Sequence, residues 1–417
     1  MIPMDSLRKA LFRALSKSHL PMLRSTLSLG VSLGYAPGDP MPVFHAALSG
    51  GFADLAVLQT LEAAGADPTT IEAYDLLSPL HLAIALPDAR ILEWLIADGL
   101  DVNAQTRAGE TPLMRAAELR TYEDEDPSAA EWALRDARVL IAASANLNLT
   151  DAAGQTALHY ACEAGAAEMA TLLVLAGAEV NIADANDDTP LHLAAMGGYD
   201  AIARLLLQNS ADPKAVNKLG FSGLHVLAER PGMDMTPAHL RLADALIKAG
   251  GDLNQHDNRG FSPLVAAAAV GNIPIAAVFV AHHVDASADS SAALRQAVLF
   301  EDDDMTDLLM KAGSAVDLPW GAEDERPLHT AAHEGFVHGV KALLDHGADI
   351  EARNIDGETP LLVAARRQKY AVVMLLVQRG ASVGAEDHYG CTAAMVAEQR
   401  NDAILQRLIG TSIPVIG

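Results

Sequence analysis

Apolar residues recur along this chain in pairs of short helical patterns. Near the middle of the chain, Leu158, Ala161 and Cys162 are three and four residues apart, so they share one face of a helix. Gly165 interrupts this pattern, and a second helical pattern then runs to Gly177, a residue type that readily adopts the left-handed conformation found at helix ends. The local unit predicted here is a pair of short helices.

The position that ends the second helix recurs with a period of 33 residues, because the successive intervals are 34, 45, 33, 33, 40, 33, 30, 34 and 33. Two of these intervals indicate insertions and one indicates a shortened unit. A fixed period means that one structural unit is repeated, so the spacing predicts a tandem array. The recurring positions are Gly65, Gly99, Ser144, Gly177, Ser210, Gly250, His283, Gly313, Gly347 and Gly380.

A second landmark, close to Thr-Pro-Leu-His, follows about a dozen residues after most of these positions. Its Ser or Thr can cap a helix start, and Pro in the first helical position gives up no hydrogen bond that the helix needs. The copies begin at Ser78, Thr111, Thr156, Thr189, Ser222, Ser262, Pro327 and Thr359. In its period and in this signature the chain resembles the ankyrin repeat family, from about Pro42 to about Ile409.

The resemblance implies an all-α solenoid of helix-turn-helix units joined by short β-hairpin fingers, about twelve units with the caps included. Asp or Asn opening a turn and Gly closing it, as in Asp151-Ala152-Ala153-Gly154, favours such fingers. We expect a degenerate capping unit at 1–40, the repeat array at 41–409 and a tail at 410–417. Because each unit buries its apolar face only against its neighbours, we also expect an elongated, curved body.

Three segments depart from the repeat. Insertions near 121–130 and 230–237 are predicted to project as loops between paired helices, and the first contains the acidic run Glu123–Asp126. The degenerate unit at 287–317 lacks the Thr-Pro-Leu-His element and carries Glu301–Asp304, so its hairpin or its first helix is predicted to be truncated.

Composition and charge narrow the functional classes. Half of the residues are hydrophobic but only 4% are aromatic, which suits closely packed helices, and the net charge of −25 disfavours nucleic acid and anionic lipid surfaces as partners. Two cysteines favour a cytoplasmic location, and the lack of a long apolar run disfavours a membrane span. The protein is also expected to be a monomer. The basic helix pattern near Arg8 and Arg13 is interpreted as a cap, with a targeting element as the alternative.

No cofactor, metal or catalytic residue is predicted, because the candidate motifs fail on geometry or residue type. Zinc ligands lie about 2 Å from the metal, whereas equivalent residues of adjacent repeats lie roughly 10 Å apart. The recurring histidines are therefore predicted to tie hairpin to helix start: His81, His159, His192, His225 and His329. His329 with His333 has the spacing of a metal pair but lacks the Glu of a metalloprotease helix.

Two further candidates fail on residue type. The run Asp184–Asp188 begins like a calcium loop, but Thr189 and Ala195 stand where Gly and a bidentate Glu belong, so a hairpin is predicted. Cys162 is expected to be inert packing, whereas Cys391 lies near a hairpin and is expected to be more exposed.

The resemblance implies a protein that is not an enzyme and that binds a partner protein through hairpin tips and exposed inner-helix residues. The acidic charge favours a basic or mixed-charge partner. The alternatives are an enzyme with an acid–base site in the 287–317 unit, or a bacterial effector that targets a host protein. The predicted partner-binding residues are Tyr74, Asp75, Arg107, Asn186, Asp187, Lys218, Leu219, Asn258, Arg259, Trp320, Ile355, Asp356, His388 and Tyr389.

Overall fold

The computed structural model describes residues 4–17, 19–34, 41–49, 53–71, 75–118, 128–282, 289–319 and 324–410. These residues form 24 α-helices and one short 3-10 turn, and none of them is assigned to an extended strand. The predicted all-α repeat fold is therefore confirmed. The predicted fingers are present as tight, hydrogen-bonded turns rather than as paired strands.

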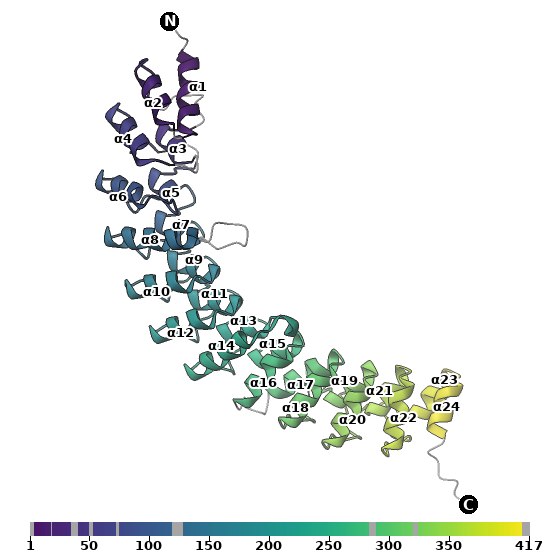
Figure 1. Ribbon diagram of the computed structural model, residues 1–417. Coiled ribbons are helices and arrows are strands. Elements are labelled where there is room, and N and C mark those ends of the chain that lie inside the picture. Colours follow the sequence, from purple (N-terminus) through teal and green to yellow (C-terminus); the bar gives the residue numbers. More distant parts are fainter. Residues whose placement is uncertain are drawn as a thin grey trace, which may run out of the picture. The chain divides into compact units, whose positions relative to one another are not determined.

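Contacts along the chain divide the protein into two units, Met1–Asp212 and Pro213–Gly417. Unit 1 is a stack of helix pairs in which each odd-numbered helix, here called an inner helix, packs on the next odd-numbered one (Figure 1). Its helices are α1 (Met4–Leu15), α2 (Leu20–Leu27), α3 (Val43–Leu48), α4 (Leu55–Ala63), α5 (Pro79–Ala83), α6 (Ala89–Ala97), α7 (Pro112–Glu118), α8 (Ser128–Ala142), α9 (Ala157–Ala164), α10 (Ala167–Leu175), α11 (Pro190–Gly197) and α12 (Asp200–Gln208).

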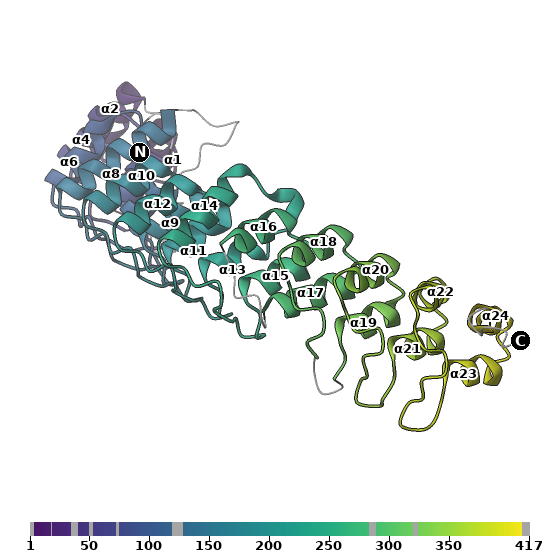
Figure 2. The same ribbon diagram turned by 90° about the horizontal axis from the view of Figure 1, so that it is seen from below.

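Unit 2 repeats the arrangement, with odd-numbered inner helices and even-numbered outer helices in two layers (Figure 2). Its helices are α13 (Gly223–Ala228), α14 (Pro237–Lys248), α15 (Pro263–Ala269), α16 (Ile273–Ala281), α17 (Asp289–Leu299), α18 (Asp303–Lys311), α19 (Pro327–Glu334), α20 (Val337–Asp345), α21 (Pro360–Arg366), α22 (Tyr370–Gln378), α23 (Ala393–Gln399) and α24 (Ala403–Gly410). The 3-10 turn η1 (Gly232–Asp234) lies between α13 and α14.

The predicted helix-ending landmarks have one backbone conformation. Every described landmark has a positive φ, including Ser144 at 67° and Ser210 at 68°, where a side chain is tolerated in place of Gly. The residue four positions earlier is buried with no exposed surface in each repeat of both units: Leu61, Leu95, Leu140, Leu173, Leu206, Leu246, Phe279, Leu309, Leu343 and Leu376. Since burying such a side chain stabilises by about 1.5–3 kcal/mol, this column of residues is a large part of the core.

The recurring histidines lie at the contact between successive repeats. In His159, Nδ1 accepts a hydrogen bond from the backbone N–H of Thr156, and Nε2 lies 3.2 Å from the carbonyl oxygen of Asp188, just before the next Thr-Pro-Leu-His copy. The same pair of contacts is made by His81 and His225, and His45, which has no Thr-Pro-Leu before it, bonds to Leu77 O at 2.7 Å. The predicted structural role is confirmed, with a bond to the next repeat that the sequence did not reveal.

The departures from the repeat are only partly as expected. Thr121–Pro127 lies outside the described residues, and Ser128–Ala130 begins α8 instead of forming a loop. The insertion after Ala228 connects α13 to α14 and includes η1. A truncated first helix in the 287–317 unit is wrong, because α17 has 11 residues, and its Ala293, Leu294, Ala297 and Val298 are fully buried without a Thr-Pro-Leu-His start.

The histidine geometry predicts acid sensitivity. Burial lowers the pKa of His81, His159, His225 and His329 below the ordinary value near 6.5. The unfolded chain therefore binds more protons below pH 6.5, so these histidines stabilise the fold above that pH and the stabilisation is lost as pH falls. Protonated Nδ1 also faces a backbone N–H.

We expect the urea concentration at the midpoint of unfolding of the full chain, measured by circular dichroism, to decrease when the pH is lowered from 7.5 to 5.5. In His159→Gln, which does not titrate, the loss of stability over this window should be smaller than in the parent. The matched control is His256→Gln, because His256 is exposed. Equal pH slopes for the parent and His159→Gln would contradict the assignment.

Candidate protein-binding site

The fingers owe their shape to the Asp or Asn that opens each turn. In the finger of α9, Asp151 Oδ1 accepts from the N–H groups of Ala153 at 2.9 Å and Gln155 at 2.8 Å, and Gly154 N–H donates to Asp151 O. Equivalent carboxylate or amide oxygens organise the other fingers: Asp184, Asn217, Asp257, Asn354 and Asp387. The predicted hairpin role of Asp184 is thereby confirmed.

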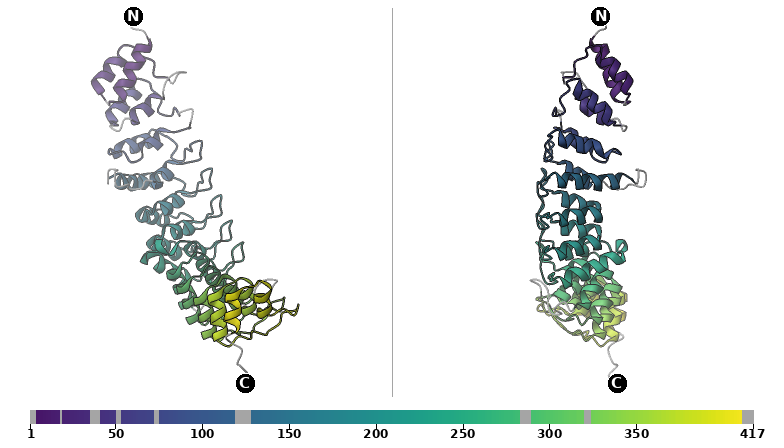
Figure 3. Two further views of the ribbon diagram at one scale, coloured as in Figure 1. Left: turned by 90° about the vertical axis from the view of Figure 1, so that its right-hand side faces the viewer. Right: turned by 60° about the vertical axis from the view of Figure 1, so that its left-hand side comes forward.

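Neighbouring fingers within a unit are joined by backbone hydrogen bonds. In unit 1, Arg107 N–H donates to Asp75 O at 2.8 Å, and the N–H of Ala152 donates to Ala108 O at 2.7 Å. The approach is close, since a Cβ atom placed on Gly154 would lie 2.8 Å from Ala185 N. In unit 2 the corresponding bonds are Asn258 N to Leu219 O and His388 N to Asp356 O. The fingers follow one another along one edge of unit 1 (Figure 3).

The described residues of the predicted partner-binding set are all exposed. Backbone bonds bring some of them together in pairs: Asp75 with Arg107 in unit 1, and Leu219 with Asn258 and Asp356 with His388 in unit 2. Tyr389 is 80% exposed and Ile355 is 54% exposed. Tyr74 and Trp320 lie outside the described residues, so the proposed tryptophan anchor stays a prediction.

The charge of Arg259 is paired within the fold. Its guanidinium bonds to the carboxylates of Asp257 and Glu229 and lies over the rings of Phe221 and Phe261, 5.2 and 4.9 Å from their centroids. Burial raises the pKa of Asp257, but the N–H of Phe261 and the Arg259 side chain outweigh this and hold the pKa below its ordinary value. Arg259 therefore stabilises the finger as well as offering a surface.

A similar clamp was missed in the sequence. Arg366, on the inner helix α21, lies 2.6 Å from Glu358 and 2.6 Å from Asp387, and so joins the finger before its own helix to the next finger. The sequence did not indicate this pairing, because the corresponding position of the other inner helices is occupied by many residue types and the carboxylates are distant in sequence. Fingers with such clamps present a surface that is held in place before a partner arrives.

The residues considered for metal binding or nucleophilic chemistry make hydrogen bonds within the fold or are buried in its core. Among the described residues no group of three or more metal-ligating side chains is present. His329 uses Nδ1 on Arg326 N–H and Nε2 on Glu358 O, and His333 pairs with Glu334. Cys162 is fully buried, as predicted, and burial raises the pKa of its thiol.

The acidic run Glu301–Asp304 lies at the start of α18. Asp302 caps that helix by accepting from Met305 N–H at 2.9 Å, while Glu301, Asp303 and Asp304 are exposed. Carboxylates near a helix start are stabilised by the helix dipole, which accounts for Asp302 to Asp304 without any catalytic role.

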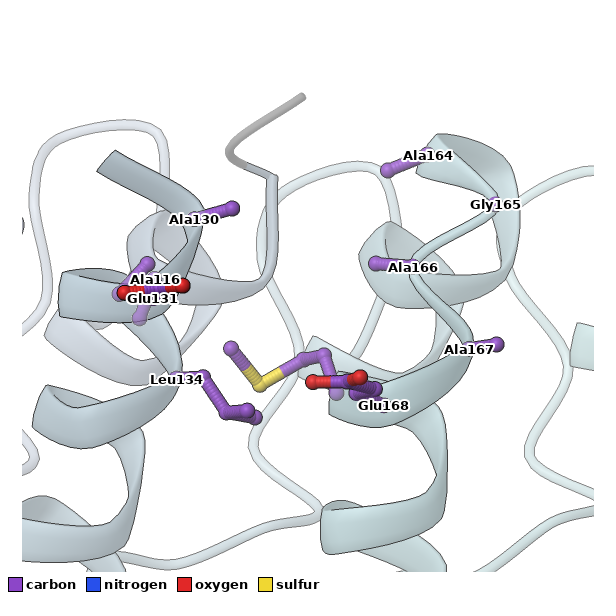
Figure 4. A pocket seen from close by; sticks show the side chains of 11 residues that line it. Ala116, Ala130, Glu131, Leu134, Ala164, Gly165, Ala166, Ala167 and Glu168 are labelled. Atoms are coloured by element: carbon purple, nitrogen blue, oxygen red, sulfur yellow. The ribbon is translucent and has the colours of Figure 1, made fainter. Parts of the chain in front are cut away.

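A cavity of about 250 Å³ lies in unit 1 between α7, α8 and the turn from α9 to α10. Figure 4 shows Glu131 and Leu134 on one side and Ala164 to Glu168 on the other. Its origin is Ala166, which precedes α10. In the next repeat the same backbone position is Tyr199, whose ring packs on Gly165, with φ and ψ of −82° and 76° against −79° and 79° at Ala166.

Comparison with known proteins agrees with the geometry. The family model of ankyrin repeats in three copies matches residues 128–217, 294–387 and 328–415, and the single ankyrin repeat model matches 75–107, together more than half of the chain. The chain is similar to the nuclear factor NF-kappa-B p105 subunit of Gallus gallus, with 29% identity over 157 residues. This match covers 34% of the chain and 16% of that relative. No described helix is long and apolar enough to cross a bilayer.

Filling the cavity should stabilise unit 1. In Ala166→Tyr the backbone already has the conformation of Tyr199, so the ring can enter the cavity beside α7 and α8 and raise the free energy of unfolding by about 1 kcal/mol. Thermal melting measures the gain. Ala176→Tyr, at an exposed position after the same helix, should leave the melting temperature unchanged. A lower melting temperature for Ala166→Tyr would show that the space is not available to a ring.

Proposed function

We propose that this chain, which belongs to the ankyrin repeat family, is a non-catalytic scaffold, adaptor or inhibitor that binds a partner protein through its fingertips and exposed inner-helix residues. Proteins of this family mediate protein–protein interaction, and the binding face and the charge of the partner are our proposals. The observation that carries the proposal is the division of labour within the fingers: in most of them an opening Asp or Asn shapes the turn, while the two residues that follow it are exposed.

The fingertips of unit 2 support this proposal best. Ile355 and Tyr389 are large apolar side chains on successive fingers, and the fingers themselves are joined by the bond between His388 N and Asp356 O at 2.9 Å. Aromatic side chains held on a rigid backbone are typical anchors of protein interfaces, since they bury a large area at little entropic cost. Tyr389, with 80% of its surface exposed, is accessible to a partner.

The charge indicates the kind of partner. The chain has 54 acidic and 29 basic side chains, and the guanidinium groups of Arg259 and Arg366 at the fingers of unit 2 are paired with carboxylates. A basic or mixed-charge partner would be attracted and oriented by this field. The Gallus gallus relative is named as a subunit, which is in keeping with a role in an assembly, but the short match transfers no specific partner.

The experiment is a capture of partners by the full chain and by fingertip variants. We expect a discrete protein, identified by mass spectrometry, to be lost or reduced at least about ten-fold with the double variant Ile355→Ser, Tyr389→Ala. Met374→Ser is the matched control, because Met374 is 45% exposed on the outer helix α22 of the same unit.

Salt tests the electrostatic part separately. Exposed charges are screened over about 8–10 Å at physiological ionic strength, so capture should weaken as salt rises. Full retention of the same protein by the double variant would refute the fingertip surface, and capture that does not change with salt would refute the basic character of the partner.

A further inference from the structure

Large apolar side chains are exposed at three consecutive helix-to-helix turns of unit 2, away from the fingers. Met233 in η1 is 97% exposed, Val270 after α15 is 38% exposed, and Leu299 and Phe300 at the end of α17 are 40% and 60% exposed. We call these four residues the turn ridge. Figure 2 shows the long connections of unit 2 at the opposite edge of the helices from these turns.

The turns that carry the ridge are in contact. A Cβ atom on Gly232 would lie 3.1 Å from Gly271 O, and one on Gly271 would lie 3.4 Å from Asp302 Oδ2. The side chain of Asn272, which is fully buried, donates to Arg230 O at 2.8 Å. The three turns that carry the ridge are therefore adjacent, and exposed apolar side chains gathered on adjacent turns favour an interaction site.

The fold does not require apolar residues at these positions. At the positions that correspond to Leu299 and Phe300, two other inner helices of unit 2 have polar or charged residues: Glu229 and Arg230 at the end of α13, and His333 and Glu334 at the end of α19. The core of α17 is supplied by other residues, among them Leu294 and Ala297, both fully buried. Exposing Leu299 and Phe300 therefore has no structural purpose within the described part of the chain.

Acidic side chains border the ridge on the side of α18. Glu301, Asp303 and Asp304 are exposed, and Asp234 is exposed beside Met233. Asp303 lies 4.0 Å from His338, whereas Glu301 and Asp304 have no ion-pair partner among the described residues. A partner that covers the apolar side chains would thus gain most from carrying cations at its own edge.

We propose that the turn ridge binds a basic amphipathic helix of a partner protein, a second surface beyond the fingertips. Adjacent repeats lie roughly 10 Å apart. Seven residues of a helix rise about 10.5 Å, so apolar side chains repeated every seven positions come into register with successive turns. The lysines and arginines that flank such an apolar stripe face Glu301 and Asp304. An anionic membrane surface would instead be repelled by this acidic edge.

The test uses a fluorescein-labelled peptide of three heptads, with Leu at a and d and Lys elsewhere, titrated with the full chain and followed by anisotropy. The expected result is binding that weakens about ten-fold in Phe300→Ser, and that weakens in Glu301→Gln, Asp304→Asn at low ionic strength. The matched control is Leu175→Ser, since Leu175 is 77% exposed on α10 of unit 1 and should not contribute.

Hydrogen–deuterium exchange with the bound peptide locates the contact, and should show protection at 229–234, 269–274 and 299–304. Tyr389→Ala, which tests the fingertips, should bind the peptide as the parent does, so the two surfaces can fail independently. Circular dichroism confirms that each variant is folded. Unchanged affinity in Phe300→Ser, protection confined to the fingers, or equal binding of a peptide with Glu in place of Lys would each overturn the proposal.

Discussion

A pair of short helices cannot bury its apolar face alone, and everything else in this protein follows from that constraint. The buried residue four positions before each landmark, such as Leu173 or Leu343, is covered only because the next pair lies against it. Stability within each unit is therefore spread along the stack, and every repeat must match its neighbours in shape. Recognition is left to positions that the stacking does not use.

The contact between repeats is polar as well as apolar. In His81, His159, His225 and His329, Nδ1 accepts a backbone N–H at the start of the same helix and Nε2 bonds to the backbone of the next repeat, as His81 does with Glu110 O at 3.0 Å. This bond fixes the register of one repeat on the next, because the buried imidazole is held at the start of its own helix and its partner is a backbone carbonyl of the next repeat. The requirement for a neutral ring makes the same contact sensitive to acid.

Two kinds of surface emerge within unit 2, and they have different origins. Fingertips such as Tyr389 are exposed because a tight turn points its middle residues outward, whatever their type. The turn ridge is exposed where an inner helix ends, and Phe300 is apolar there although Glu334, in the same place two helices later, is not. Separate edges of the stack thus carry different patterns of exposed side chains, and we propose that they bind separate partners.

The sequence by itself determined the repeat, the helix pairs, the fingers and the structural histidines, because caps, glycines and helical spacing act over a few residues and recur in phase. It also placed Ile355 and Tyr389 at exposed turns. Only the tertiary structure decided what depends on the neighbouring repeat: the pairing of Arg259 with Glu229, the cavity left by Ala166, the full length of α17, and the exposure of Phe300. Such contacts join residues that are far apart in sequence, and whether a helix residue is buried or exposed is set by what packs against it.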